Sequence, residues 1–177
     1  MSAGRNNIPE GVKDITINAF EGTSLTNITI PETLQTTDPS IFARNSVLTS
    51  VEWNSINCKD FNSSINGPFY ANKSQIENFT FGNNVRRIPA NLCYEMDNNN
   101  HTQAIIPPSC ETISNHAFYH NTKLSYIQLG TSNSDTLAQA DMDVSIKTIA
   151  EHAFDLCFSV NTCLIPYNVT SIGTLSF

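Results

Sequence analysis

The hexapeptide Ile149-Ala150-Glu151-His152-Ala153-Phe154 repeats an earlier one, Ile113-Ser114-Asn115-His116-Ala117-Phe118. Near the start the chain has Ile15-Thr16-Ile17-Asn18-Ala19-Phe20, and its last six residues, 172–177, keep the first Ile and the final Phe at the same spacing. Such self-similarity is typical of a repeat array, in which each repeat buries its apolar face against its neighbours. The sequence therefore predicts a solenoid.

A short strand that ends in proline accompanies the hexapeptide, at 28–31, 104–107 and 163–166. Strands are predicted from alternating apolar residues whose second inward positions are Ile30, Trp53, Phe81, Ile106, Leu129 and Ile165. The shortest advance between them, from Ile30 to Trp53 and from Ile106 to Leu129, is 23 residues, within the range of leucine-rich repeats. The predicted fold is a right-handed leucine-rich-repeat array, with a parallel β-sheet on one face and short strands, turns or short helices on the other.

This array forms one predicted domain, residues 1–177, of six to seven repeats with the first and last incomplete. The advance from Leu129 to Ile165 is 36 residues, which predicts an insertion loop at 130–145. Insertions in repeat proteins map to loops on one face, often the binding face. Because the chain ends on the aromatic of an unfinished repeat without a polar cap, we expect a longer protein or an end covered by oligomerisation.

Composition and charge exclude some partners. The net charge is −7, from 9 basic and 16 acidic residues, so nucleic acid is not an expected partner because phosphate contacts need Lys and Arg. No apolar run reaches the roughly 18 residues of a membrane span. Residues 1–5 are not followed by an apolar stretch, so the sequence shows no signal peptide.

The five cysteines are expected to be unpaired. Their number is odd, and the chain has no C-x-x-C pair, which argues against a disulfide framework and against a zinc site. Cys93, Cys110 and Cys163 fall on apolar positions of the repeat. We therefore predict that these three pack in the core as small hydrophobic residues.

The frame Ile-Pro, Val, Ile, Ala-Phe, Leu, Ile resembles the BspA-like, Treponema-type leucine-rich repeats of bacterial and some protozoal surface proteins. It is carried by residues 8–28, 106–127 and 165–177, while the variants at 53–58 and 81–94 look like repeats from gut Bacteroidetes. The resemblance implies a bacterial source of that kind and an extracellular or cell-surface location. It also implies adhesion to host or bacterial proteins.

Sequence motifs for chemistry are few. His116 and His152 share one repeat position and are expected to stack, with His120 nearby, but no third or fourth zinc ligand is identifiable. Asp135, Asp141 and Asp143 lack the glycine turn and closing Glu of a calcium loop. No G-x-S-x-G, H-E-x-x-H or phosphate-binding loop occurs, so we predict no enzyme and no cofactor.

Six Asn-x-Ser/Thr sequons occur, about the number expected by chance in so Asn-rich a chain, so they say little about glycosylation. They begin at Asn27, Asn62, Asn72, Asn78, Asn100 and Asn168. Asn27 and Asn78 fall on the outward face of the predicted sheet, where a glycan would cover it.

The outward face of the predicted sheet is the candidate binding surface. Its proposed ligand-binding residues are Glu52, Thr80, Ile105, Tyr126, Gln128 and Leu164. Exposed apolar side chains rimmed by polar ones indicate an interaction surface, and Tyr is enriched at binding hot spots. The alternative is that these apolar residues are ordinary surface residues, or that the insertion covers them.

The predicted function is a non-enzymatic binding module of a secreted or cell-surface protein, with an extracellular protein or glycan as partner. The alternative from a different class is a rigid spacer that displays another domain. The two differ in whether the isolated chain binds anything.

Overall fold

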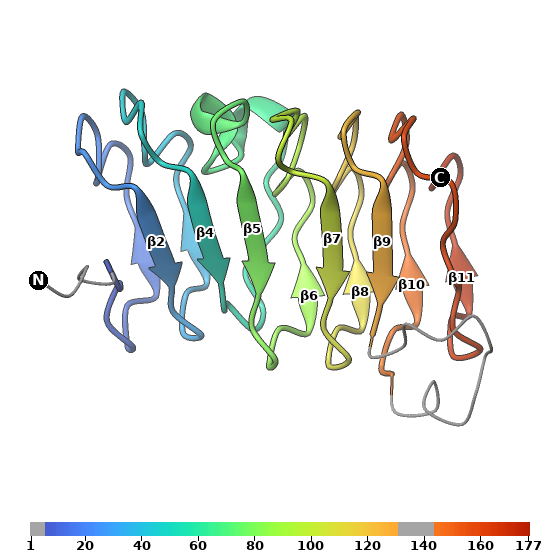
Figure 1. Cartoon of the computed structure of the whole chain (residues 1–177). Coiled ribbons are helices and arrows are strands. Elements are labelled where there is room, and N and C mark those ends of the chain that lie inside the picture. The colour runs from blue at the N-terminus through green and yellow to red at the C-terminus, as the bar shows by residue number, and fades with distance from the viewer. Residues whose placement is uncertain (1–5, 131–143) are drawn as a thin grey trace, which may run out of the picture.

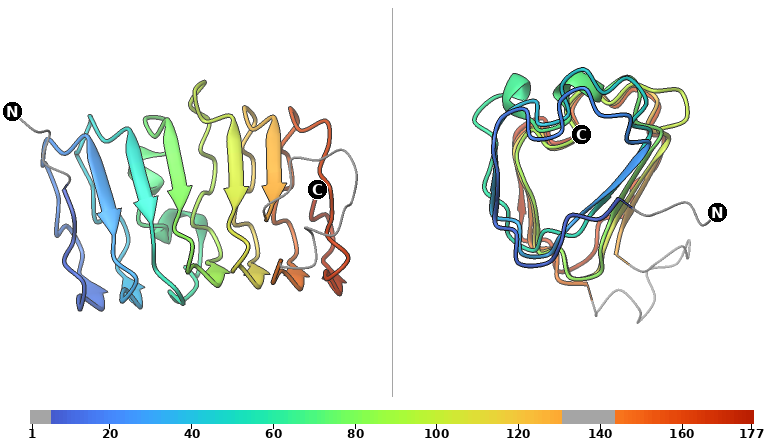
Figure 2. Two further views of the ribbon diagram at one scale, coloured as in Figure 1. Left: turned by 60° about the horizontal axis from the view of Figure 1, so that its bottom comes forward. Right: turned by 90° about the vertical axis from the view of Figure 1, so that its left-hand side faces the viewer.

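The computed structural model describes residues 6–130 and 144–177 and shows a parallel β-solenoid of about six turns with almost no helix. Viewed along its axis, the coil has a triangular outline, so that each turn contributes one segment to each of three faces (Figure 2). The predicted fold class is confirmed. The predicted insertion at 130–145 falls mainly on residues 131–143, which lie outside the described residues.

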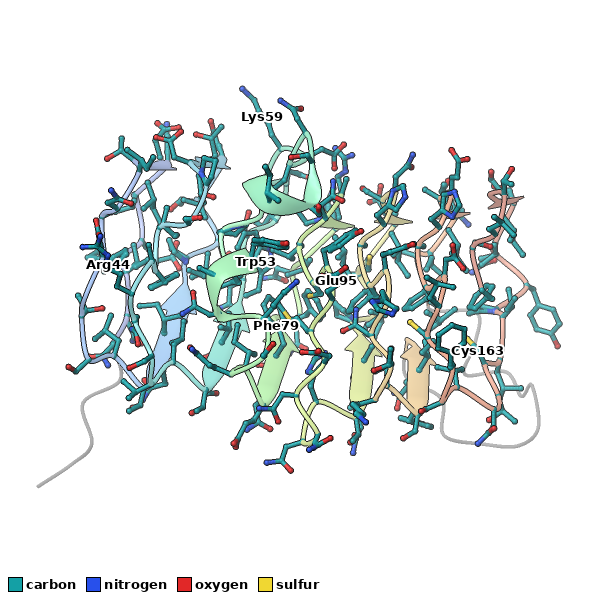
Figure 3. The ribbon with its side chains drawn as sticks, turned by 90° about the horizontal axis from the view of Figure 1, so that it is seen from above. Arg44, Trp53, Lys59, Phe79, Glu95 and Cys163 are labelled. Carbon is teal, nitrogen blue, oxygen red and sulfur yellow. The ribbon has the colours of Figure 1, made fainter. Side chains whose placement is uncertain are left out.

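The first face is a row of parallel four-residue strands, which lie side by side in Figure 1. Two of their inward residues, Trp53 and Phe79, are labelled in Figure 3. These are β2 (Asn27–Ile30), β4 (Ser50–Trp53), β5 (Asn78–Phe81), β7 (Gln103–Ile106) and β9 (Tyr126–Leu129). Side chains alternate between the core and the outer face because the strand period is two. Five of the six predicted strands are thereby confirmed.

The sixth predicted strand, at 163–165, is wrong, because these residues form no strand. Leu164 and Ile165 are both exposed, at 45% and 37%, so this segment has no inward and outward side. Cys163, predicted to be in the core, is only partly buried. Pro166 offers a physical reason, since it has no backbone N–H to donate to β9.

The second face consists of two-residue strands at the Ile position of each repeat. These are β1 (Asp14–Ile15), β3 (Thr36–Thr37), β6 (Arg87–Ile88), β8 (Thr112–Ile113), β10 (Thr148–Ile149) and β11 (Ser171–Ile172). They pair in parallel as β1-β3 and as β6-β8-β10-β11. The longer third repeat has no such strand, and its short 3₁₀ helices, η1 (Ser64–Asn66) and η2 (Tyr70–Asn72), come later in the turn, on either side of Phe69.

The third face is built by the repeated hexapeptide. Its backbone N–H groups donate to the following turn, as from Phe118 to Ala153 at 2.8 Å and from Phe154 to Ser176 at 2.9 Å. The residue before the small one takes a left-handed conformation, with φ of 56° at His116 and 55° at His152. Asn and His are enriched in this conformation. Asn18 and Asn91 follow this preference at the same position of other repeats, whereas Ser40 and Leu175 adopt the conformation without it.

The hexapeptide phenylalanines stack inside the coil. Ring centroids lie 5.1 Å apart between Phe20 and Phe42, and 5.0 Å apart between Phe118 and Phe154, with nearly parallel planes. The fourth repeat has Cys93 at this position instead of Phe. The space is filled from the strand side by Phe79 and Phe81, and Phe81 reaches Phe118 edge-on at 6.0 Å. The row of rings therefore continues across the repeat that lacks its own phenylalanine.

All five cysteines are free, as the sequence predicts, and four of them are buried. Burial raises the pKa of Cys58, Cys110 and Cys157 to about 12 and that of Cys163 to about 11, because it disfavours the thiolate. Cys93 and Cys110 lie in the core as predicted. Their thiols act as small apolar side chains rather than as nucleophiles.

Buried asparagines tie consecutive turns together. The Nδ2 of Asn72 donates to the Asn45 carbonyl at 2.7 Å, and the Nδ2 of Asn121 donates to the carbonyls of Cys93 and Phe118, both at 2.7 Å. Buried carbonyls need a donor from within the protein. The Phe118 carbonyl also accepts a hydrogen bond of 3.2 Å from the Cys157 thiol. Near the surface, Asn98 makes the equivalent bond to Ser74 at 3.1 Å, where water has access.

We expect Asn121→Ala to lower the free energy of unfolding by about 2–4 kcal/mol, because the buried Cys93 carbonyl loses its donor and the Phe118 carbonyl keeps only the weak thiol donor of Cys157. Asn98→Ala is the matched control and should cost less than about 1 kcal/mol, since water replaces the amide. Urea unfolding followed by circular dichroism measures both. Equal losses in the two variants would show that burial of the amide is not what stabilises the turn.

Candidate functional site

The outer face of the strand sheet carries five of the six predicted binding residues. Glu52, Thr80, Ile105, Tyr126 and Gln128 lie on β4, β5, β7 and β9 with their side chains directed outward. Ile105 is 49% exposed and Tyr126 is 37% exposed. Leu164, the sixth, belongs to no strand and is not held in register with them.

Register places these residues in two groups. Glu52 is opposite Thr80, and it accepts a hydrogen bond of 3.2 Å from the Thr29 hydroxyl. Ile105 is opposite Gln128. The hydroxyl of Tyr126, two residues before Gln128 on β9, donates to the Gln128 side-chain oxygen at 3.3 Å. Ile105 and Tyr126 are thus diagonal neighbours on adjacent strands, close enough for an aromatic side chain to bridge.

The sheet is split between these two groups. Strands β2, β4 and β5 form one hydrogen-bonded sheet and β7 and β9 form another, and the space between β5 and β7 is visibly the widest in the row (Figure 1). In the paired strands the residue just before the strand donates to the preceding turn, as from Ser125 to the Thr102 carbonyl at 2.9 Å. The Thr102 N–H instead bonds to Asn100 at 3.0 Å, within its own turn.

Proline 107 gives a physical reason for the split. The residue after a paired strand donates its N–H to the preceding strand, as Gly82 does to Trp53 and Gly130 does to Ile106, both at 2.9 Å. Pro107 follows β7 and has no N–H to donate to β5. Pro31 after β2 and Pro166 likewise have no N–H to donate to the preceding turn. Strand β2 pairs with the first repeat only through an isolated bridge, from Thr29 to Asn7.

A cleft of about 330 Å³ lies at the split and is lined by residues 77–81, 100–103 and 105. Thr80 stands on one bank and Ile105 on the other. Phe81 lines the cleft although it occupies an inward strand position, and it is only half-buried. The corresponding Trp53 and Ile106 are 0% and 1% exposed, so the opening uncovers the Phe81 ring.

His101 lines the cleft and is 2% exposed. Its Nε2 has no hydrogen-bond partner in the protein. Burial lowers its pKa to about 4, while a hydrogen bond to the Glu77 backbone acts in the opposite direction. The Glu77 carbonyl precedes β5 and would accept the ladder hydrogen bonds of β7 in an unbroken sheet. The imidazole therefore occupies the place of the missing ladder and remains neutral at pH 7.

The three histidines near the hexapeptides form a separate cluster, as the sequence predicts. The rings of His116 and His152 stack at 4.7 Å, and Tyr119 lies 5.3 Å from His116 and 6.1 Å from His120. Burial lowers the pKa of His116, and the adjacent His152 lowers it further. Within residues 6–130 and 144–177, no group of three or more His, Cys, Asp or Glu side chains is placed to hold a metal ion.

His101 and the half-buried Phe81 were not among the residues predicted to form the site from sequence. The proline after a strand was recognised as a strand end, and Pro107 was therefore a usable signal for the split. The size of the opening depends on His101 and on the turn at Asn100, neither of which follows an alternating pattern.

This geometry defines a leucine-rich-repeat solenoid whose strand face is interrupted between β5 and β7. The sequence matches the family described as BspA type Leucine rich repeat region, in six copies over residues 4–125 and 93–177, and the chain belongs to this family. No curated protein matches the sequence. Among the described residues, no helix has the length and apolar character needed to cross a membrane.

Two crystal structures have a similar fold. A leucine-rich repeat protein from Eubacterium ventriosum superimposes with a TM-score of 0.60 at 21% identity, over 98% of this chain and 42% of that one. The T. pallidum leucine rich repeat protein gives 0.59 at 16% identity, over 94% of this chain and 72% of that one. This chain therefore spans less than half of the Eubacterium protein, and the likeness is one of fold.

The neutral His101 should make stability depend on pH. Its pKa is about 4 in the native state and 6.5 ordinarily, so below pH 6.5 the unfolded chain binds a proton that the native chain does not. Stability is complete above pH 6.5 and decreases as the pH falls toward 4, by up to about 3 kcal/mol. We expect His101→Gln to lack this loss, measured as the difference between the two proteins in urea unfolding at pH 7 and at pH 4.5. If the free energy of unfolding fell equally with pH in the parent and in His101→Gln, His101 would not be the source of the pH dependence.

Proposed function

We propose that this chain is a non-enzymatic binding module of a secreted or cell-surface protein, which contacts an extracellular protein or glycan through the outer face of its strand sheet. The observation that supports this is the cleft between β5 and β7, with half-exposed Ile105 on its bank and Tyr126 beside it. A concave site that combines apolar and polar groups is the usual form of a binding site. Its position on the face of a repeat array suits an extended partner.

A catalytic role fits the structure poorly. The histidine best placed to act as a base is His152, whose Nδ1 lies 2.8 Å from Asp155. A general base needs its other ring nitrogen directed at a nucleophile. The Nε2 of His152 instead lies 3.6 Å from a Glu151 carboxylate oxygen, so both nitrogens face carboxylates. This arrangement orients the ring and leaves neither ring nitrogen directed at a nucleophile.

The test is binding of the purified chain to an array of extracellular-matrix proteins, mucins and glycans. We expect the variant Ile105→Ser with Tyr126→Ala to lose more than about tenfold in affinity, because exposed apolar and aromatic anchors dominate binding energy. The matched control changes the same residue types away from this face, Ile65→Ser with Tyr167→Ala, where the side chains are 59% and 65% exposed.

A control variant that loses as much affinity as the test variant would remove the site from the sheet face. A folded protein that binds nothing on the array would contradict the proposal and favour a rigid spacer. The row of stacked phenylalanines would then be the relevant feature, since it stiffens the coil along its axis.

A further inference from the structure

We infer that the cleft between β5 and β7 binds a neutral sugar residue of a glycan. This rests on the proposed function, and it names the class of ligand that the same site would take. The floor of the cleft, its rim and its charge each favour this class of ligand.

The floor of the cleft is apolar and partly open. Phe81 is half-buried, its ring lies 5.3 Å from that of Phe79, and Ile105 is 49% exposed at the side. A sugar ring presents C–H groups on its faces, which pack on exposed aromatic and aliphatic surface. No other repeat among the described residues has a strand aromatic uncovered at its inward position in this way.

Apart from Glu77, the rim is polar and uncharged. Asn78 on β5 and Gln103 on β7 face each other across the opening, with Asn100 and Thr102 at one end. Amides and hydroxyls both donate and accept hydrogen bonds, which matches the hydroxyl groups around a sugar ring. The strand edges add further groups, because β5 and β7 are not hydrogen-bonded to each other. A ligand here can bond to backbone donors and acceptors that, in the other neighbouring pairs of these strands, are hydrogen-bonded from strand to strand.

Charge separates a neutral sugar from the alternatives. The described residues that line the cleft include no Lys or Arg, and their one carboxylate belongs to Glu77. The net charge of the chain is −7. An anionic sugar would therefore meet repulsion and no ion pair. The volume of about 330 Å³ is at the lower end for small-ligand sites, which suits one ring-sized group and not a peptide strand with its side chains.

The test is titration of the ¹⁵N-labelled chain, made in a bacterium so that Asn78 and Asn100 stay unmodified, with free monosaccharides. The neutral probes are glucose, galactose, mannose and N-acetylglucosamine; the anionic probes are glucuronic acid and N-acetylneuraminic acid. We expect at least one neutral probe to shift the backbone amides of Gln103 and Ile105. Both anionic probes should bind more weakly than that probe.

Variants locate the site. Gln103→Ala should weaken binding of the neutral probe by about fivefold, the loss expected for one hydrogen-bonding side chain. Gln35→Ala is the matched control, because it removes the same type of side chain from an exposed position outside the cleft, and it should leave the affinity unchanged. Equal losses in the two variants would overturn the proposed location.

Two other outcomes would overturn the inference and are distinguishable. If no neutral sugar binds but a protein from the array binds and depends on Ile105 and Tyr126, the sugar inference fails and the proposed function stands. If neither sugars nor array partners bind the folded chain, both fail. Tighter binding of the anionic probes would contradict the charge argument.

Discussion

Backbone hydrogen bonds from each turn to the next hold this solenoid together. A single turn of about 23 residues has almost no buried surface of its own, so it folds only against a neighbour. Each face contributes: the four-residue strands, the two-residue strands, and the hexapeptide turns whose N–H groups donate onward, as from His152 to Thr174 at 3.0 Å. The stacked phenylalanines and buried asparagines fix the distance between turns that these bonds require.

The candidate site lies where one of the three ladders is interrupted and the other two are not. Behind the split, β6 and β8 remain paired, and Cys93 still donates to Ala117 at 2.9 Å, so the turns on either side stay in register. The opening on the strand face is therefore a local feature with rigid banks. It exposes Phe81 and leaves backbone groups unpaired, which an unbroken sheet would not do. A rigid, pre-formed site of this kind loses little conformational entropy on binding.

Repeat periodicity was sufficient to predict most of the fold. The spacing of Ile, Ala-Phe and alternating strand residues predicted five strands and the fold class, because those positions are set by stacking alone. The strand at 163–165 was wrong, since an apolar alternation does not reveal whether Pro166 leaves a usable ladder. The site was predicted only in part: Thr80 and Ile105 follow from the outward period of two, whereas His101 and the exposure of Phe81 arise from a missing contact between turns. Patterns within one repeat carry no information about such a gap.

The central claim is that the strand ladder is broken between β5 and β7, and amide hydrogen exchange tests it most directly. The amides of Gln103 and Ile105 should exchange much faster than those of Tyr126 and Gln128, the equivalent residues one repeat later, whose strand is paired with β7. All four lie in the same kind of strand and share the outward orientation, so the comparison isolates the ladder. Equal protection of the four amides would mean that the sheet is continuous, and the cleft, with both proposals built on it, would have to be abandoned.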